Sequence, residues 1–422
     1  MRKYRNGGRL DIVIRALRPV LLLLLAAVPA IALRISGVHP AAPLAIVVFG
    51  LGVVAASFVL AWAAEAAEVD ISGGLAIALL AVIAVLPEYA VDLYFAHTAG
   101  SQPEYVAYAA ANMTGSNRLL LGLGWSSVVL ISLYVASKRS GRTIKALVLE
   151  SGYRRELGFL AVASVVAFII PITGQIHLLL GIALLAFFAY YLWRAAASDH
   201  DHEPDLIGPA ARIGGLDKVQ RRIAVVSMFV VSAGIILMSA EPFADSLVQG
   251  GRALGIDQFL LVQWLAPLAS EAPEFIVAIL FAWRGKGAAA LGLLISAKVN
   301  QWTLLIGSLP IAYGIGGGPA ALPLDGRQVE EFLLTATQTV LGLAVLLSLR
   351  FPRWAAWTLL GLFAVQFAVP GQTGRYVLSG VYLVLAIWAL SYNRQYVVQT
   401  LTSPFRRTPK VAAEQDRELV GV

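Results

Sequence analysis

The sequence has no cysteine and few charged residues. Without cysteine, a chain of 422 residues cannot form disulfides, thiolate metal sites or cysteine nucleophiles. Only 14% of the residues are charged, whereas about a quarter are charged in a typical soluble domain. Because 59% of the residues are hydrophobic, too little polar surface is left to cover a globule, and a soluble single-core protein is excluded.

Two common functional motifs are also missing. The sequence contains neither a Gly-x-x-x-x-Gly-Lys-[Ser/Thr] phosphate loop nor a His-Glu-x-x-His zinc motif. No serine and histidine pair lies at an obvious catalytic depth in the apolar runs. These absences disfavour an ATP-driven machine and an intramembrane enzyme, and no cofactor is expected. A membrane scaffold that transports nothing remains an alternative.

Apolar runs separated by short polar breaks predict an all-α polytopic membrane protein. A bilayer core takes about 20 helical residues per crossing. The runs lie near residues 19–36, 43–65, 74–97, 105–137, 157–173, 176–194, 223–247, 257–283, 288–314, 331–349, 354–370 and 376–391. The count is ten to twelve, with twelve preferred, because the short runs near Pro171 and Gly371 can be merged differently. A cleaved signal peptide is the competing interpretation of the first run.

Positive charges set the predicted orientation. Six basic clusters fall on one side of a twelve-span topology: the N-terminus, Lys138–Arg155, Arg212–Arg222, Arg284 with Lys286, Arg350 with Arg353, and Arg394–Lys410. The opposite loops carry only Arg34, Arg252, Arg327 and Arg375. By the positive-inside rule both termini are cytoplasmic. The net charge of +7 therefore indicates contact with membrane lipid rather than nucleic acid, and the short loops favour a bacterial plasma membrane.

The longest polar interruption, residues 195–222, divides the spans into two sets of six. It contains Asp199-His-Asp-His-Glu-Pro-Asp205, which could bind a metal ion through histidine and carboxylate groups. A solvated acidic linker is the preferred interpretation, because contiguous ligands on a flexible loop lack a scaffold. The basic tail after Arg394 is predicted to be disordered.

Four acidic residues lie deep in the predicted spans. They are Glu88 and Asp92 in the third span and Glu271 and Glu274 in the eighth. A charge at this depth costs several kcal/mol and survives mainly where it lines a pathway or pairs with another charge. Spacings of four and three residues place each pair on one helix face.

A proline directly precedes Glu88 and Glu274. Pro87 and Pro273 each remove a backbone donor and free a carbonyl oxygen about one turn earlier. A broken helix with carboxylates is an oxygen-rich site that suits hard cations such as Ca²⁺ and Na⁺. The sequence therefore predicts two matched segments that could bind small inorganic cations.

Amide and hydroxyl residues follow each acidic segment in the next span. They are Asn112, Ser116 and Asn117 in the first set, and Ser296, Lys298 and Asn300 in the second. Asn117 lies seven residues before Gly124, and Asn300 lies seven before Gly307. The glycines would let backbones approach closely, and the amides could complete coordination. Taken singly, each motif also fits capping or helix packing.

A proline followed directly by an acid, with an amide and a glycine in the next span, thus occurs twice in opposite orientations. The eighth span comes five crossings after the third, and because five is odd, the two copies are antiparallel. This is the layout of inverted-repeat secondary transporters, in which alternating access exposes a midplane site to each side. We expect Glu88 and Glu274 to meet around a common pocket there.

These motifs resemble the cation/calcium exchanger superfamily, whose signature is Gly-Thr-Ser-Leu-Pro-Glu followed by Gly-Asn-x-x-Gly-Ser-Asn. Leu86-Pro87-Glu88 with Asn112-Met-Thr-Gly-Ser-Asn117 match the first copy, and Ser270-Glu-Ala-Pro-Glu274 with, less well, Ser296-Ala-Lys-Val-Asn300 match the second. The resemblance implies two inverted repeats of five helices plus one extra span at each end. The segments are then 1–42 (N-terminus and extra span), 43–194 (first repeat), 195–222 (cytoplasmic linker), 223–370 (second repeat), and 371–422 (extra span and tail).

The resemblance also implies roles for the matched residues. Glu88 and Glu274 would be paired carboxylates that bind Ca²⁺ and exchange it for Na⁺ or protons, and Asn112, Asn117 and Asn300 would be coordinating or packing amides. The usual Thr-Ser pair is replaced by Ala84-Val85 in the first copy and by Ser270-Glu271 in the second. This replacement removes ligands of the usual Na⁺ sites.

Lys298 departs furthest from the pattern. Its ammonium could pair with Glu271 or Glu274 in the volume of a metal ion and lose its proton when an ion enters. Alternatively, the side chain could form a fixed salt bridge or extend to a membrane boundary. The first functional hypothesis is an antiporter that exchanges Ca²⁺ or Na⁺ for H⁺ or Na⁺. The second is an exchanger fold in which Lys298 replaces a bound cation, so that the protein carries only Na⁺ and H⁺ or transports no ion.

Overall fold

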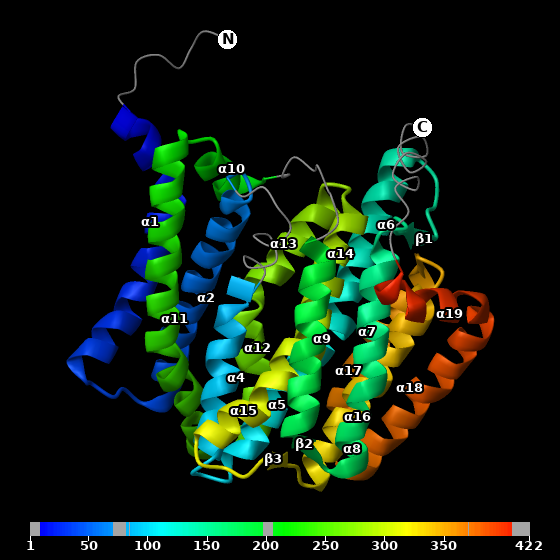
Figure 1. The fold of residues 1–422 in the computed structure, drawn as a ribbon. Coiled ribbons are helices and arrows are strands. Elements are labelled where there is room, and N and C mark those ends of the chain that lie inside the picture. Colours follow the sequence, from blue (N-terminus) through cyan, green and yellow to red (C-terminus); the bar gives the residue numbers. More distant parts are fainter. Residues whose placement is uncertain (1–8, 71–81, 84, 197–205, 370, 407–422) are drawn as a thin grey trace. The chain divides into compact units, whose positions relative to one another are not determined.

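The computed structural model describes residues 9–70, 82–83, 85–196, 206–369 and 371–406, and most of them are helical (Figure 1). The chain folds into two compact units. Unit 1 comprises Met1–Phe95 and Leu192–Pro273, and unit 2 comprises Ala96–Tyr191 and Glu274–Val422. Both units therefore combine segments from the two halves of the sequence. The segment boundaries expected from the sequence stay a prediction.

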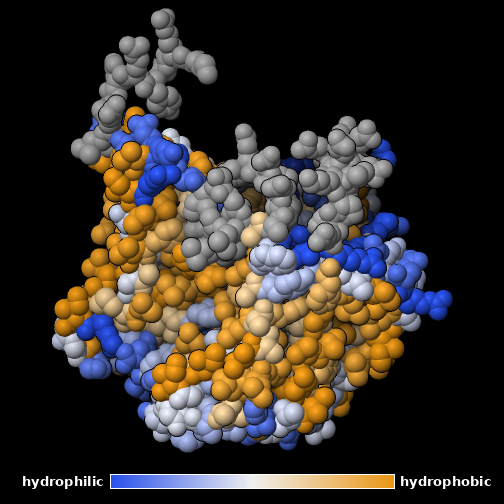
Figure 2. All heavy atoms as spheres, viewed as in Figure 1, coloured by the Kyte–Doolittle hydropathy of each residue, from blue (hydrophilic) through white to orange (hydrophobic). Residues whose placement is uncertain are grey.

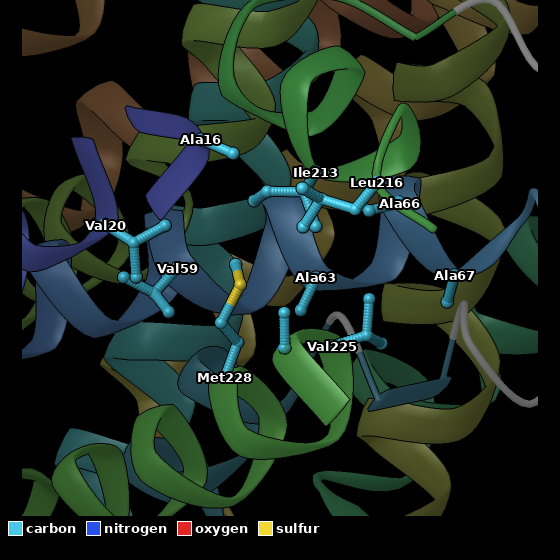
Figure 3. Close-up of a cluster of buried hydrophobic side chains, with 11 residues drawn as sticks. Ala16, Val20, Val59, Ala63, Ala66, Ala67, Ile213, Leu216, Val225 and Met228 are labelled. Carbon is cyan, nitrogen blue, oxygen red and sulfur yellow. The ribbon is translucent and has the colours of Figure 1, made fainter. Parts of the chain in front are cut away.

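Unit 1 is built from long helices. Its elements are α1 (Arg9–Ser36), α2 (Ala42–Ala67), most of α4 (Leu86–Ala99), α10 (Gly208–Gly214), α11 (Lys218–Leu254) and α12 (Gln258–Ser270). Small and branched side chains of α1, α2 and α11 meet in an apolar cluster that includes Val20, Val59, Ala63 and Met228 (Figure 3). Alanines let these helices approach closely, because little side-chain volume separates the backbones.

Part of the predicted linker belongs to this cluster. Ile213 of α10 is fully buried among the side chains of α1, α2 and α11. Residues 208–214, within the predicted cytoplasmic linker, therefore form a packed helix. The Asp199–Asp205 segment, with its alternative as a metal-binding cluster, lies outside the described residues.

Unit 2 contains the remaining helices. They are α5 (Tyr105–Leu119), α6 (Ser126–Ser140), α7 (Tyr153–Ala167), α8 (Ile169–Thr173), most of α9 (Leu178–Ala196), most of α13 (Ala272–Trp283), α14 (Gly287–Asn300), α15 (Ile306–Ile315), α16 (Gly326–Leu346), α17 (Arg353–Ala368), α18 (Gln372–Tyr392) and α19 (Arg394–Thr402). Two π-helical segments, η1 (Leu120–Trp125) and η2 (Gln301–Leu305), and a 3₁₀ turn, η3 (Ser403–Phe405), complete the helical elements.

Four short strands join the two sequence halves within unit 2. β1 (Ala146–Val148) pairs with β4 (Arg350–Pro352), and β2 (Gln175–His177) pairs with β3 (Ala321–Pro323), both antiparallel. β1 and β3 follow α6 and α15, and β2 and β4 precede α9 and α17, so exchanging the halves exchanges the pairs. The two ladders lie at opposite ends of these helices (Figure 1). This arrangement confirms that the repeats are inverted.

The number of membrane crossings is only partly fixed by the described residues. Among them, nine helices are long and apolar enough to cross a membrane, and the bent pair α12 and α13 could add a tenth. Part of the predicted third span lies in residues 71–81, outside the description, and α17 has 16 residues. The preferred count of twelve stays a prediction. Apolar side chains cover much of the visible surface (Figure 2), and Leu22 and Leu25 of α1 are more than half exposed.

The prediction of a disordered tail after Arg394 is wrong for its first part. Residues 394–405 form α19 and η3, which pack on α7. Arg154 of α7 donates to Thr400 at 3.1 Å, and the hydroxyl of Ser403 donates to the carbonyl oxygen of Arg154 at 2.9 Å. Gly158 leaves room for this contact, since a Cβ there would lie 2.4 Å from Thr400 O. Residues 407–422 lie outside the described chain.

Candidate functional site

The first acidic pair lies on one face of α4. Leu86 and Ala90 pack against a second apolar cluster of α1, α2 and α11, which includes Ala56 and Ile236. The Tyr94 hydroxyl donates to Asp245 Oδ1 of α11 at 2.7 Å. Glu88 and Asp92 are offset by two residues, or about 200° around the helix, and therefore occupy the opposite face. Their exposed fractions are 5% and 0%. The predicted helical spacing thus separates a packing face from a carboxylate face.

A break in the helix precedes Glu88, as the proline predicts. Ile83 is helical, Val85 lies in a turn, and α4 begins at Leu86. Pro87 occupies the first turn of α4, where its missing N–H leaves no hydrogen bond unmade. The first-turn position also places Glu88 near the positive end of the helix dipole.

The second acidic segment has the same local structure. α12 ends at Ser270, Glu271 is the break with φ near −95° and ψ near 0°, and α13 begins at Ala272 with a bend of 57°. Val85 and Glu271 each lie two residues before a proline, so the two breaks match. Glu271 is buried and Glu274 is partly buried. The predicted pair of broken helices is present.

The acidic residues are divided between the two units. Glu88, Asp92, Ser270 and Glu271 belong to unit 1, and Glu274 belongs to unit 2. The predicted meeting of Glu88 and Glu274 stays a prediction. Within each unit, the described residues contain no group of three or more His, Asp or Glu side chains that could hold a metal ion. A bound cation would therefore also need amide, hydroxyl or backbone oxygens.

Both amide segments lie in unit 2, and both lead into a π-helical segment. Asn112, Ser116 and Asn117 are fully buried on α5, which continues into η1. On α14, Asn300 is 7% exposed and directly precedes η2. π segments widen a helix and occur frequently at functional sites. Their equivalent positions in the two halves support the predicted internal repeat.

The predicted close approach at the glycines is also present. A Cβ at Gly124 would lie 2.6 Å from the ring of Phe275, and one at Gly307 would lie 2.8 Å from the carbonyl oxygen of Gly181. Distances below about 3.0 Å do not occur for real Cβ atoms, so side chains here would force the helices apart. The glycines therefore allow α9 and α15 to pack backbone against backbone.

Lys298 contacts the first amide segment directly. Its fully buried ammonium donates to the backbone oxygen of Asn117 at 2.9 Å and to Asn117 Oδ1 at 3.1 Å. It also lies 5.9 Å from the ring centre of Trp302, within the range of a cation–π contact. Because a snorkelling lysine exposes its ammonium to water, the full burial of this group contradicts the snorkelling alternative.

Three other predicted residues have identifiable surroundings. Ser296 exchanges a 2.9 Å hydrogen bond with the hydroxyl of Tyr191. Both amide atoms of Asn112 are buried, and no described residue provides them with a hydrogen bond. In unit 1, Ser270 donates back to the carbonyl oxygen of Ala266 at 3.1 Å. Asn112 therefore retains donor and acceptor capacity that a ligand or water could use.

The sequence analysis missed a buried charge cluster in unit 2. Arg118 Nη2 lies 2.5 Å from Glu331 Oε2, and Arg375 Nε lies 3.4 Å from Glu331 Oε1. Arg375 also donates to the carbonyl oxygen of Gln366 at 3.0 Å. Arg375 was expected in an outer loop, but α18 begins at Gln372 and buries it. The charge of Arg118, next to Asn117 within an apolar run, was the available signal.

A separate ion pair in unit 1 lies just beyond the end of α2. Asp70 accepts two hydrogen bonds from Arg221, at 2.8 and 2.9 Å, and Arg221 also donates to the carbonyl oxygens of Gly214 and Leu216. The hydrogen bonds from Arg221 hold the pKa of Asp70 below its usual value. Arg221, in the first turn of α11, therefore holds both the end of α10 and the segment that follows α2.

Comparisons with known proteins agree with this architecture. The profile of the sodium/calcium exchanger protein family matches residues 41–196 and 224–370. The chain is 40% identical to the H⁺/Ca²⁺ exchanger CAX, over 93% of this chain and 98% of that chain, with a TM-score of 0.87. No curated protein sequence matches.

Two more distant structures show the fold alone. The Ca²⁺/H⁺ antiporter protein YfkE matches at 15% identity over 86% of this chain and 99% of that chain, with a TM-score of 0.58. The sodium-calcium exchanger NCX_Mj matches at 17% identity over 78% and 98%, with a TM-score of 0.51.

Proposed function

Because the chain belongs to the sodium/calcium exchanger family, a family of membrane transporters and not of enzymes, we propose that it is a secondary antiporter that exchanges Ca²⁺ for H⁺. The 40% identity to an H⁺/Ca²⁺ exchanger over nearly the whole of both chains favours this ion pair. The chain is an integral membrane protein, and its helices are apolar enough to cross a bilayer. No bound cofactor is needed for such exchange, because an existing ion gradient drives it.

The matched acids at two helix breaks are the observation that carries the proposal. Glu88 and Glu274 each follow a proline in the first turn of a helix, and each has a second acid within four residues. A carboxylate can bind either a proton or a hard cation, but not both at the same oxygen. Ca²⁺ and H⁺ would then compete for the same groups, which is what exchange requires.

One observation favours a second candidate function. The Lys298 ammonium is fully buried and already occupies two oxygens of Asn117. In this alternative, Lys298 takes the place of the transported metal ion, and the protein carries only Na⁺ and H⁺ or transports no ion. The two candidates differ in whether Ca²⁺ moves at all.

The direction of the helices completes the proposal. We expect both termini to be cytoplasmic, since the basic clusters fall on one side of the predicted topology, and we expect the bacterial plasma membrane as the location. Cysteine substitution of Lys138 should label only from the cytoplasmic side, because Lys138 lies at an exposed end of α6. The absence of native cysteine makes that labelling unambiguous.

Transport in reconstituted vesicles tests the function. An imposed pH gradient should move radiolabelled Ca²⁺ in the wild type, and Glu88→Gln or Glu274→Gln should abolish the movement. Glu104→Gln is the matched control, because Glu104 is an exposed acid before α5 with no capping hydrogen bond. Unchanged Ca²⁺ flux in both Glu88→Gln and Glu274→Gln would remove the proposed site. Wild-type vesicles that move Na⁺ but no Ca²⁺ would favour the alternative.

A further inference from the structure

The contact between Lys298 and Asn117 joins equivalent places in the two sequence halves. Asn117 lies three residues before η1, and Lys298 lies three residues before η2. Counted from the π segments, Lys298 and not Asn300 therefore corresponds to Asn117. Residues near a two-fold axis contact their own equivalents, so this contact marks the internal axis of unit 2.

The symmetry allows Asn117 and Lys298 to be compared as equivalent positions. Two equivalent amides at this axis would present their oxygens to each other, and a cation between them would satisfy both. Here Asn117 supplies two oxygens, and the ammonium of Lys298 lies 2.9 and 3.1 Å from them. The second half thus contributes a positive charge where the first half contributes ligands.

The surroundings fix the position of the ammonium at this place. Lys298 has no exposed surface, and the backbone and side-chain oxygens of Asn117 converge on its Nζ atom. The amide nitrogen of Asn117 donates to the carbonyl oxygen of Met113 at 3.2 Å, which turns Oδ1 toward the ammonium. The same two oxygens are the kind of ligand that a hard monovalent cation uses.

We propose that the Lys298 ammonium is a tethered monovalent cation that occupies a Na⁺ site at the Asn117 oxygens and thereby excludes Na⁺ from the exchange cycle. The inference rests on the proposed Ca²⁺/H⁺ exchange and makes Lys298 its specificity-determining residue. Removing the ammonium frees both oxygens and one positive charge. A Na⁺ ion can then bind where the lysine was.

Binding of Na⁺ is tested on the purified full-length protein. The unfolding temperature is measured in NaCl and in choline chloride at equal ionic strength. Lys298→Ala should be stabilised by Na⁺ in a saturable manner, because a ligand that binds only the folded state raises its stability. The wild type and Lys298→Arg, which keep a fixed positive charge, should show no Na⁺ dependence. Lys138→Ala removes an exposed lysine from α6 and serves as the control.

Transport is tested in vesicles without a pH gradient. An imposed Na⁺ gradient should drive Ca²⁺ uptake in Lys298→Ala at least about tenfold faster than in the wild type. A factor of ten corresponds to about 1.4 kcal/mol of Na⁺ binding that the wild type lacks. Lys298→Arg should behave like the wild type. Arginine keeps the positive charge of lysine but differs from it in shape. Wild-type behaviour of Lys298→Arg would therefore show that the charge, and not the packing of the side chain, excludes Na⁺.

A second variant tests the same site in case Lys298→Ala does not fold. Lys298→Gln removes the charge but retains most of the volume and adds an amide oxygen, so it should gain the same Na⁺ dependence. The inference is overturned if folded Lys298→Gln or Lys298→Ala shows no Na⁺ effect in either measurement. It is equally overturned if the wild type responds to Na⁺ as strongly as the variants.

The two proposals fail in distinguishable ways. If the wild type moves no Ca²⁺ in a pH gradient, the proposed function fails, but the Na⁺-dependent unfolding temperature still reports on the site. If the wild type exchanges Ca²⁺ for H⁺ and the variants show no Na⁺ dependence, only the proposed role of Lys298 is wrong.

Discussion

Units 1 and 2 place their ion pairs at different depths. In unit 1, Arg34 and Glu241 pair with exposed fractions of 42% and 47%, and Asp70 pairs with Arg221 beyond the end of α2. In unit 2, Arg118 and Glu331 pair with exposed fractions of 1% and 2%. A buried pair recovers its desolvation cost only with good geometry, so stability alone rarely explains one.

The difference indicates two ways of fixing helices. The described helices of unit 1 meet mainly through apolar clusters of alanine, valine and methionine, which are non-directional. Its ion pairs are half-exposed or lie beyond the end of α2. Unit 2 adds strand ladders, a buried charge cluster and the lysine contact with Asn117, all of which are directional. Directional contacts select one arrangement of helices, and the proposed ion site needs a fixed arrangement of oxygens.

Breaking the buried pair should give the largest effect on stability. Glu331→Ala leaves the charge of Arg118 buried with its partner removed, and we expect a loss of about 3–5 kcal/mol. The unfolding temperature of the purified protein measures it. Arg34→Gln, which breaks the exposed pair in unit 1, should cost only about 0.2–1 kcal/mol. Equal losses in both variants would contradict the distinction between the units.

Filling the close approach of α9 and α15 should give the next largest effect. The new Cβ of Gly181→Ala would lie 2.7 Å from the carbonyl oxygen of Gly307, and we expect overpacking to cost about 1–3 kcal/mol. Gly234→Ala on α11 of unit 1 is the control, because no atom lies within 4 Å of its new Cβ. That variant should be neutral or more stable, since alanine favours a helix over glycine. A stable Gly181→Ala protein would show that the helices can separate freely.

Removing the carboxylate of Asp70 should have the smallest effect and change the response to acid. Because Arg221 lowers the pKa of Asp70 in the folded state, the pair stabilises the protein above the unfolded pKa of about 3.9. That contribution is lost as the pH falls through the lower folded pKa. Asp70→Asn should therefore have a lower unfolding temperature than the wild type at pH 7, and the difference should shrink in acid. A difference that grows in acid would contradict this assignment.

The sequence predicted the helices and the breaks well because these features are local. Apolar runs predicted the helices from α5 to α9 and from α11 to α18, with ends that differ from the observed ones by up to seven residues, at the end of α11. Pro87 and Pro273 gave the breaks before Glu88 and within the bend at Glu271, because proline removes a hydrogen bond wherever it occurs. The glycines predicted the close helix contacts, because the lack of a Cβ is also a property of the residue itself.

Features that depend on distant partners were not predicted. The strands have three residues each, too few for a periodic signal, and they pair across about 150 to 200 positions. The packing of residues 394–405 depends on Gly158 and Arg154 far away in the sequence. Aligning the amides by residue type selected Asn300, whereas the π segments select Lys298. Residue type alone does not reveal where a helix widens.

The two strand ladders have a mechanical consequence. Helices that touch only through side chains can slide along one another by small steps, since one ridge replaces the next. A ladder hydrogen bond tolerates no such step, because a shift of one residue reverses every side chain. One ladder lies at each end of these helices (Figure 1). The ladders therefore oppose any sliding of the two sequence halves of unit 2 along the helix axes.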